Sequence, residues 1–517
     1  MTRENRLKYF LFAGSFTLFI LWTWQLPFLG PDEPRYAQVA REMLEHKDFF
    51  VPRLGGNAWF EKPVLLYWLM ALSYASFGVN EFAARLPSVL AAFFSVVILY
   101  GTMNTIRGAK EALLSATVLA TTSFFASFSH AATFDMLLTF CITSALCCYL
   151  LYEHEQRNSK WLRWMYVFAG SGVLAKGFVA LALIGIILIS YLILSRRWKE
   201  LFLLKPVEGA LIVAAVTAIW FIPVSMIYGS RFWDEFVYRH HFVRYTSTQY
   251  HRSQSLLFYI PVMLAGTYPW SFAPFSARPA ATDLKRFALC WLLGPVVFFT
   301  ISQTKLPGYV LPVIPAFAIL AGLSLAVHTN RIRALALGIG VNLLLIGGLL
   351  WGAQEYEIPT HNLYIACGYI AVFLLFVSFL YLKRKFFAST IAYALILPAA
   401  MALFAFRIFP DLNWIDSKKL PLQWAETAPQ NAKLVPYNLY DFGPLFYTNG
   451  RMELTPEGYP FIVTSDAQLH RYLMQRGEAH VLALNEDVDW MKRAGFWKVH
   501  NIIRGENISI VELHPQR

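Results

Sequence analysis

The ionisable residues of this chain are concentrated in a few short segments that separate long apolar stretches. The first of these segments, Gly30 to Tyr36, contains two adjacent acids, Asp32 and Glu33. A carboxylate at such a position can act as a general base, or it can orient an attacking hydroxyl or phosphate. We therefore take Asp32 and Glu33 as catalytic candidates. A purely structural role for Asp32, as the N-cap of a helix, stays open.

Other ionisable residues stand at the ends of predicted membrane crossings or in the adjoining loops. Lysine and arginine side chains suit the oxygens of a phosphate or pyrophosphate group. The candidates for such contacts are Lys62, Lys176, Arg244, Lys305 and Tyr309. Lys176 and Lys305 could instead extend toward the phosphates of membrane lipids, so that alternative also stays open.

Three further residues complete this group of candidates. Asp135 lies at the end of a predicted crossing with the other candidates, although it could simply end a helix in headgroup water. Glu61 and His241 could together hold a divalent cation, but two ligands are weak evidence for a metal site. His241, like its neighbour His240, could also be an ordinary loop residue.

The apolar stretches that carry these residues predict a polytopic α-helical membrane protein. The chain has 517 residues, of which 57% are apolar, and its apolar runs match the ~20 residues that cross a bilayer. We expect about thirteen crossings. They are predicted near 9–27, 86–105, 111–128, 136–152, 162–175, 178–195, 207–228, 256–275, 287–302, 310–327, 334–352, 363–382 and 387–408.

The basic residues fall in alternate connections between these crossings. The segment Arg196 to Lys199 is typical of one set, whereas the short connection 129–135 has no Lys or Arg. The positive-inside rule then places the N-terminus in the cytoplasm and the C-terminal region outside. The same rule accounts for much of the net charge of +12 without nucleic-acid binding.

This orientation gives two long extracytoplasmic loops, at 28–85 and 229–255. In the first loop, an amphipathic pattern beginning at Asp32 predicts a helix lying in the membrane interface. Pro63 to Gly78 is too short to cross the bilayer and predicts a second interfacial or re-entrant helix. We expect Gly55-Gly56-Asn57 to form the turn between them.

The composition changes near residue 409, which predicts a transmembrane domain at 1–408 and a small α/β domain at 409–517. Apolar runs become shorter there and alternate with turn-forming residues. The predicted strands and helices are Val435–Leu439, His480–Leu484 and Ile508–Leu513 as strands, with Asp466–Arg476 and Asp487–Ala494 as helices.

At the candidate residues the sequence resembles the GT-C glycosyltransferases that use lipid-phosphate sugar donors. It is most similar to bacterial 4-amino-4-deoxy-L-arabinose transferases acting on lipid A, and more distantly to protein O-mannosyltransferases. The resembling segments are Asp32-Glu33-Pro34-Arg35-Tyr36, Trp59-Phe60-Glu61-Lys62-Pro63, Ala132-Thr133-Phe134-Asp135, Leu174-Ala175-Lys176-Gly177, His241-Phe242-Val243-Arg244 and Lys305-Leu306-Pro307-Gly308-Tyr309-Val310-Leu311-Pro312.

The resemblance implies an inverting transfer of a sugar from undecaprenyl phosphate to a lipid A phosphate at the periplasmic face of the bacterial inner membrane. We expect a multi-pass protein that acts as a monomer among membrane lipids and does not bind nucleic acid. By the same resemblance Asp32 is the leading catalytic carboxylate and Asp135 a second acid. Lys62 and Arg244, with Lys305 and Tyr309, would contact the phosphate. Glu61 and His241 would bind a zinc-like metal.

Two alternatives remain at this stage. A related transferase would use another glycolipid, or a protein, as its acceptor. A secondary transporter or lipid flippase belongs to a different class, and such proteins usually bind substrate near the bilayer midplane. Because the charged candidates here lie at one edge of the membrane, the sequence favours the transferase.

Overall fold

The computed structural model describes residues 3–243, 254–276, 282–327, 336–344, 347, 360–383, 386–403, 416–456 and 458–516. Contacts within the chain divide it into two compact units. The first unit comprises Met1–Leu21, Phe60–Leu66 and Pro87–Leu403. The second comprises Trp22–Trp59, Tyr67–Leu86 and Phe404–Arg517.

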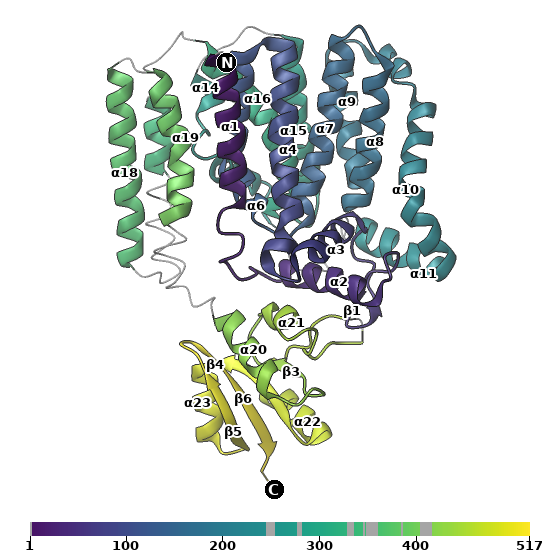
Figure 1. The fold of residues 1–517 in the computed structure, drawn as a ribbon, viewed down its shortest axis with the longest axis vertical. Helices are drawn as coiled ribbons and strands as arrows, with labels where there is room; N and C mark the ends of the chain where they lie inside the picture. Colours follow the sequence, from purple (N-terminus) through teal and green to yellow (C-terminus); the bar gives the residue numbers. More distant parts are fainter. Residues whose placement is uncertain are drawn as a thin grey trace. The chain divides into compact units, whose positions relative to one another are not determined.

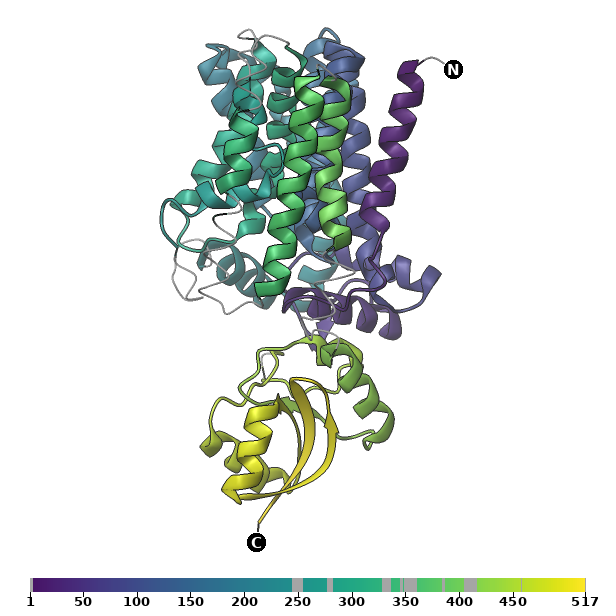
Figure 2. The ribbon, with the colours of Figure 1, turned by 90° about the vertical axis from the view of Figure 1, so that its left-hand side faces the viewer.

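The first unit is a bundle of long helices that stand side by side (Figures 1 and 2). The unit also contains the part of helix α4 (Glu81–Arg107) from Pro87 onward. Its other elements are α1 (Arg3–Ile20), α5 (Ala109–Ala120), α6 (Ser123–Ser129), α7 (Phe134–His154), α8 (Ser159–Lys176), α9 (Val179–Leu194), η1 (Trp198–Leu204), α10 (Pro206–Tyr228), α11 (Ser230–Trp233), η2 (Asp234–Val243), α13 (Tyr259–Gly266), α14 (Ala273–Ser276), α15 (Asp283–Ile301), η3 (Pro307–Val313), α16 (Ile314–Ala326), α18 (Thr360–Leu382) and α19 (Phe386–Leu403).

The described helices confirm a membrane protein but leave the number of crossings as a prediction. Five of them are long and apolar enough to span a bilayer, or six if the bent pair α5 and α6 is one span. Those two helices meet at 61°, although we expected one crossing at 111–128. Within the predicted crossing at 334–352, residues 334–335, 345–346 and 348–352 lie outside the described residues.

The predicted crossing at 256–275 is wrong as a continuous helix. The structure has two short helices there, α13 and α14, separated by turns. Pro269 lies in the break, and proline has no backbone N–H to donate to a helix. The stretch is apolar as predicted, but it is divided between two short helices.

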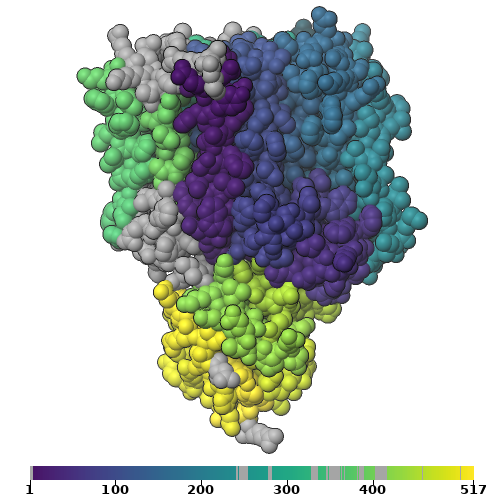
Figure 3. Space-filling model, in the orientation of Figure 1, coloured from purple at the N-terminus to yellow at the C-terminus, as the bar shows by residue number. Residues whose placement is uncertain are grey.

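Helices of the first unit differ in how much of their surface is buried. The apolar window of α7 is 89% buried and that of α10 only 17%. Helix α1 lies on the visible face in Figure 3, and its Tyr9 and Phe10 side chains are exposed. Large apolar side chains on the outside of a bundle are expected where lipid surrounds it.

The loop portion of the second unit, Trp22–Trp59 and Tyr67–Leu86, contains α2 (Asp32–His46) and all but the first two residues of α3 (Leu65–Phe77). These are the two helices predicted to lie in the membrane interface. The hairpin of β1 (Arg53–Leu54) and β2 (Asn57–Ala58) turns at Gly55 and Gly56. Both glycines have positive φ, which favours a residue without a Cβ. The prediction of Asp32 as N-cap is wrong, because the cap position is Pro31 and it makes no side-chain capping bond.

The C-terminal portion of the second unit contains a four-stranded sheet in the order β3-β4-β6-β5. Strand β3 is parallel to β4, whereas β6 is antiparallel to both of its neighbours. The predicted strands and helices are confirmed to within a few residues. Strand β5 and the helices α20 and α21 were not predicted. The elements are α20 (Asp416–Thr427), β3 (Leu434–Pro436), α21 (Gly443–Tyr447), α22 (Asp466–Arg476), β4 (Ala479–Leu484), α23 (Asn485–Ala494), β5 (Trp497–Arg504) and β6 (Ile508–Pro515).

Contacts inside the second unit join the loop portion to the C-terminal portion. The Phe28 amide donates to the Tyr447 hydroxyl over 2.9 Å, and the Phe28 ring packs against Phe446. Arg41 donates to the Phe446 carbonyl over 2.8 Å. The predicted boundary between residues 408 and 409 stays a prediction, but the tail shares a compact unit with the first long loop.

Candidate functional site

An ion pair between Asp135 and Lys176 is the centre of the candidate site in the first unit. The Lys176 Nζ lies 2.5 Å from Asp135 Oδ1. The two side chains are 15% and 19% exposed, so they are sheltered but still reachable. Such a pair can bind an anion if the lysine turns toward it.

The ends of two neighbouring helices position this pair. Asp135 lies in the first turn of α7, and Lys176 is the last residue of α8. A carboxylate at a helix N-terminus and an ammonium at a C-terminus both interact favourably with the helix dipoles. Gly177 follows with φ +83° and ends α8 there. The local sequence therefore fixes both charges at the same end of α7 and α8.

The segment at the start of η3 adds an aromatic ring to the pair. Lys176 Nζ lies 5.3 Å from the centre of the Tyr309 ring, which is a cation–π distance. A Cβ on Gly308 would approach Asp135 Oδ1 to 3.1 Å and the Phe128 ring to 3.0 Å. Glycine at 308 therefore lets the backbone of η3 come close to the Asp135 carboxylate.

Lys305 stands just before the same segment and is almost completely buried. Its Nζ donates to the carbonyl of Ser302 over 2.9 Å and to that of Gln254 over 3.2 Å. Ser302 follows the C-terminus of α15, where a cation is favourable. Lys305 is thus held by backbone oxygens, and not in a position that extends to lipid.

Glu61 and Lys62 belong to the first unit and pair with each other. Lys62 Nζ lies 3.1 Å from Glu61 Oε1, and both side chains are largely buried. The neighbouring Phe60 ring packs edge-on against Tyr228 and Phe232, which anchors this segment to α10 and α11. The pair places one acid and one base side by side in a largely buried position, and the roles predicted for Lys62 and Glu61 stay predictions.

Asp32 belongs to the second unit, in the first turn of α2. Its carboxylate forms a short ion pair with Arg35, three residues further along the helix. The Asp32 side chain is 46% exposed, whereas that of Arg35 is 12% exposed. Asp32 therefore combines a fixed cationic neighbour with an accessible carboxylate, as an acid that contacts a substrate requires.

The structure gives Glu33 a role different from that of Asp32. Its carboxylate accepts two hydrogen bonds of 2.9 Å from Arg85 and one of 2.8 Å from the Leu29 amide. Arg85 also donates to the carbonyls of Thr23, Leu26 and Pro27. This buried network favours an architectural role for Glu33 over the catalytic role predicted for it. Arg85 was not among the predicted site residues, because its only signal in the sequence is an arginine at the edge of an apolar run.

A second network in this unit was also missed. The Tyr447 hydroxyl donates to Glu81 over 3.0 Å, and Lys418 lies 2.5 Å from the same carboxylate. Burial, together with the nearby Glu81 charge, raises the pKa of Tyr447 above its ordinary value. The phenol therefore stays protonated and acts as a donor. No pattern in the sequence connects residues so far apart.

A polar cavity of about 730 Å³ lies within the second unit, between α2 and the C-terminal portion. Gln38 is buried at its wall, and its Oε1 has no hydrogen-bond partner among the residues that the structure describes. A buried unpaired acceptor is costly unless a ligand or water completes it. The charged residues that line the cavity are Glu42, Glu45, His46, Lys433, Glu453 and Arg476.

The structure brings only some of the predicted residues together. Asp135, Lys176 and Tyr309 form one cluster, and Lys305 precedes the same η3 segment. Arg244 and the side chain of His241 lie outside the described residues. The roles of these residues, the metal at Glu61 and His241, and the proximity of Asp32 to this cluster stay predictions.

Comparison with known proteins gives this geometry its context. Residues 61–227 match the family described as dolichyl-phosphate-mannose-protein mannosyltransferase. The undecaprenyl phosphate-alpha-4-amino-4-deoxy-L-arabinose arabinosyl transferase of Erwinia tasmaniensis is 31% identical over 446 residues, covering 80% of this chain and 79% of that relative. The protein of the same name from Pseudomonas aeruginosa is 31% identical over 339 residues, covering 62% and 61%.

The fold comparison agrees with the sequence comparison. The crystal structure of ArnT from Cupriavidus metallidurans bound to undecaprenyl phosphate superposes with a TM-score of 0.81. That match covers 98% of this chain and 97% of the other, at 23% identity, and so establishes a shared fold. The chain therefore belongs to the family of undecaprenyl phosphate-alpha-4-amino-4-deoxy-L-arabinose arabinosyl transferases, multi-pass membrane glycosyltransferases of the GT-C fold.

Proposed function

We propose that this protein transfers 4-amino-4-deoxy-L-arabinose from undecaprenyl phosphate to a phosphate group of lipid A. The transfer takes place at the periplasmic face of the inner membrane, with the N-terminus in the cytoplasm and the C-terminal region in the periplasm. The enzyme acts as a monomer. Family membership supports the donor and the reaction class, and it does not favour a transporter or flippase.

One observation about the geometry carries this proposal. Two sheltered lysines lie at the segment 305–309. Lys305 is its first residue, and Lys176 lies over the ring of Tyr309, its last residue. A lysine ammonium has three donors, so Lys176 and Lys305 each keep at least one donor beyond their partners among the described residues for a phosphate oxygen. We assign this cluster to the phosphate of the lipid-linked donor.

The chemistry follows from the bonds that change. An oxygen of the acceptor phosphate attacks C1 of the sugar, and the bond between C1 and the donor phosphate oxygen breaks. The electron pair of that bond leaves with undecaprenyl phosphate. Lys176 and Lys305 stabilise the charge that grows on the departing phosphate, which lowers the barrier. Asp135 holds Lys176 in position until the phosphate arrives.

Asp32 acts on the acceptor side of this reaction. A phosphate acceptor is already ionised at neutral pH and needs little deprotonation. The Asp32 carboxylate therefore orients the acceptor, together with the guanidinium of Arg35 that it binds. With a hydroxyl acceptor, the same carboxylate would act as a general base. Glu61 and His241 would hold a zinc-like metal, if one binds, and it would supply further positive charge.

The polar cavity of the second unit suits a sugar head group. The orphan Oε1 of Gln38 can accept a hydrogen bond from a ligand hydroxyl or amide, and Lys433 and Arg476 can bind anionic groups. We assign this cavity to the glucosamine head group of lipid A. Replacing Gln38 by Met should then raise the KM for the acceptor more than it lowers kcat.

Mass spectrometry of lipid A from cells with and without the protein tests the proposal. Cells that make the protein should contain lipid A heavier by one aminopentose per modified phosphate. Lipid A of unchanged mass, in cells shown to contain the folded protein and the lipid-linked donor, would reject this donor and acceptor pair.

Asp32→Asn tests the site inside the same experiment. We expect the added mass to disappear, because the neutral amide cannot replace the charge of the carboxylate. Asp48→Asn is the matched control, since Asp48 is also an acid of the first loop and pairs with a nearby arginine, Arg53. Near-normal modification by the Asp32 variant would remove that residue from the site.

A further inference from the structure

The four-stranded sheet of the C-terminal portion has two faces of different character. One face is covered by α22 and α23 and is apolar, with Val481, Val511 and Leu513 among its buried residues. The other face packs against α20 through Leu482 and Ile510. Along β6, Ile508 and Ile510 are buried on this second face, whereas Glu512 and His514 further along the strand are only half-buried.

Histidine and glutamate side chains meet at that end of β6. Strand register pairs His480 on β4 with Glu512 on β6, and Glu512 with His500 on β5. Directly paired residues on neighbouring strands project from the same face of a sheet. The ring centres of His480 and Trp424 of α20 are 5.4 Å apart. This contact identifies the face as the one that packs against α20.

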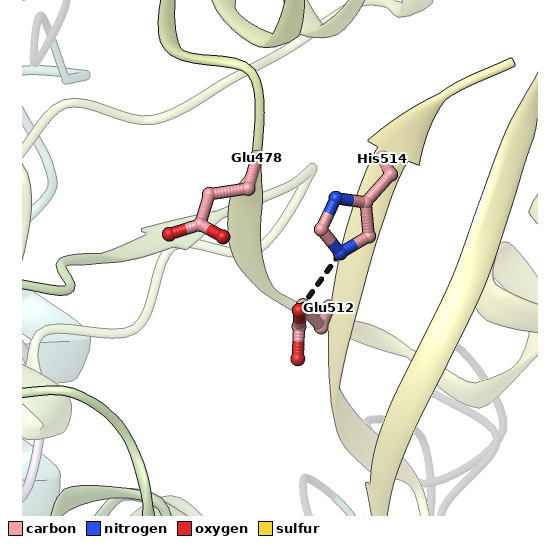
Figure 4. Close-up of side chains that lie close together, drawn as sticks. All are labelled: Glu478, Glu512 and His514. Carbon is pink, nitrogen blue, oxygen red and sulfur yellow. Dashed lines mark hydrogen bonds and ion pairs between the residues drawn. The ribbon is translucent and has the colours of Figure 1, made fainter. Parts of the chain in front are cut away.

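His514 joins this row because side chains alternate along a strand, and Glu478 lies just before β4 begins at Ala479. Glu478 precedes His480 by two positions, and His514 follows Glu512 by two. Figure 4 shows Glu478, Glu512 and His514 turned toward a common space. One potential ligand atom from each of these three lies within 4.8 Å of the others. His514 Nε2 and Glu512 Oε1 are 2.8 Å apart.

The imidazole of His500 is close to the same space. Its ring centre lies 5.4 Å from that of His514, in an edge-to-face arrangement. Three of the twelve histidines of the chain therefore occupy one end of one sheet face, with two carboxylates among them. Elsewhere in the described residues, no other group of three such side chains meets this closely.

We propose that Glu478, Glu512 and His514 form a binding site for a divalent transition-metal ion of the zinc type. Two carboxylates match the charge of a divalent cation, and imidazole nitrogen favours zinc or cobalt over calcium or magnesium. Binding of the ion replaces the contact between His514 Nε2 and Glu512 Oε1. His500 or a water molecule completes a four-coordinate shell.

This site is separate from the metal predicted at Glu61 and His241. Its three ligands all lie on β4 and β6 or beside them, in the second unit, whereas Glu61 belongs to the first. It follows from the sheet register and does not depend on the proposed function. A metal here would join the start of β4 to the end of β6, and so stabilise the folded C-terminal portion.

Cobalt titration of the full-length protein in detergent tests this inference. The starting protein carries Glu61→Gln and His241→Ala, which remove the other predicted metal ligands. We expect one equivalent of Co²⁺ to bind with the intense visible absorption of a four-coordinate site, and Zn²⁺ to displace it. Absence of a stoichiometric site would overturn the inference.

Variants of the ligands make the test specific. In that background His514→Ala should weaken Co²⁺ binding by more than the roughly 100-fold that loss of a supporting contact can cause. Glu512→Gln keeps the size of the side chain and decides the question if the alanine variant does not fold. His470→Ala, at an exposed position on α22, is the control and should bind normally. Unchanged affinity in a folded His514 or Glu512 variant would also overturn the site.

Discussion

Two acid–base pairs in this molecule have similar composition but different surroundings. The Glu33–Arg85 pair of the second unit has side chains that are 4% and 1% exposed. Arg85 there also donates to three backbone carbonyls. The Asp135–Lys176 pair of the first unit is more accessible, and Asp135 is the one hydrogen-bond acceptor that the described residues supply to Lys176.

The comparison shows how an architectural ion pair differs from a candidate site. A guanidinium whose donors are engaged has little left to offer a ligand, and its burial makes it costly to disturb. A lysine ammonium has three donors and a flexible stem, so Lys176 can turn from Asp135 toward a phosphate. Saturation of the hydrogen bonds, more than charge or sidedness, separates the two roles.

The largest effect is expected from Arg85→Leu. The substitution leaves the Glu33 carboxylate buried without its partner, which typically costs about 3–5 kcal/mol. We expect little folded protein and a strongly lowered melting temperature, measured by size-exclusion chromatography and thermal unfolding in detergent. Arg53→Leu is the control, because its pair with Asp48 is partly exposed. A normal melting temperature for Arg85→Leu would show that the network is not architectural.

Asp135→Asn should reduce activity and largely spare the fold. The amide no longer holds Lys176 by charge, and misplacement of a binding group by about 1 Å can cost roughly 100-fold in rate. We expect the KM for the lipid-linked donor to rise together with the fall in kcat. A variant that loses folded protein but keeps its kinetic constants would make Asp135 architectural, like Glu33.

A smaller effect is expected where an ion pair is partly exposed. Lys418 pairs with Glu81, and its side chain is 34% exposed. The Glu81 carboxylate is only 8% exposed, but it keeps the hydrogen bond from Tyr447, so Lys418→Met should lower the melting temperature less than Arg85→Leu does. Because salt screens such pairs, the difference from the unsubstituted protein should shrink at high ionic strength. A loss as large as that for Arg85→Leu would contradict this ranking.

The smallest effect concerns a single buried acid, Asp441, which accepts a hydrogen bond from the Gly443 amide. Burial raises the pKa of Asp441 above its ordinary value. The folded state therefore binds this proton more tightly than the unfolded state, and ionisation at neutral pH costs stability. Asp441→Asn should raise the melting temperature slightly at pH 7. That gain should fade as the pH falls toward 3.8, and a constant gain would contradict the assignment.

Local patterns predicted much of the fold. Helix α22 was predicted with the bounds that the structure has, because Ser465 caps its start and Gly477 follows its end. The break between α13 and α14 was missed, since apolar content alone does not show where a helix stops. Strand β5 was missed because its sequence does not alternate regularly. Its pairing with β6 is correspondingly irregular between His500 and Ile503.

Contacts between distant residues were the part that a single sequence could not supply. Glu33 and Arg85 are 52 positions apart, and Glu81 and Tyr447 are 366 apart. Asp32 and Glu33 looked alike in the sequence, as adjacent acids at the start of one helix. Only their positions on α2 separate them, since one faces Arg85 in the interior and the other remains accessible.

The most direct test is the rate of sugar transfer per folded molecule for Lys176→Met, with Lys199→Met, an exposed lysine outside the cluster, as the reference. Loss of a preorganised donor to developing charge typically costs about 100- to 1,000-fold in kcat. We predict a loss of that size for Lys176→Met with normal folding, and no comparable loss for the reference. Transfer by the folded Lys176 variant within about threefold of the reference, a difference of about 0.7 kcal/mol, would contradict a phosphate site at Asp135, Lys176 and Lys305.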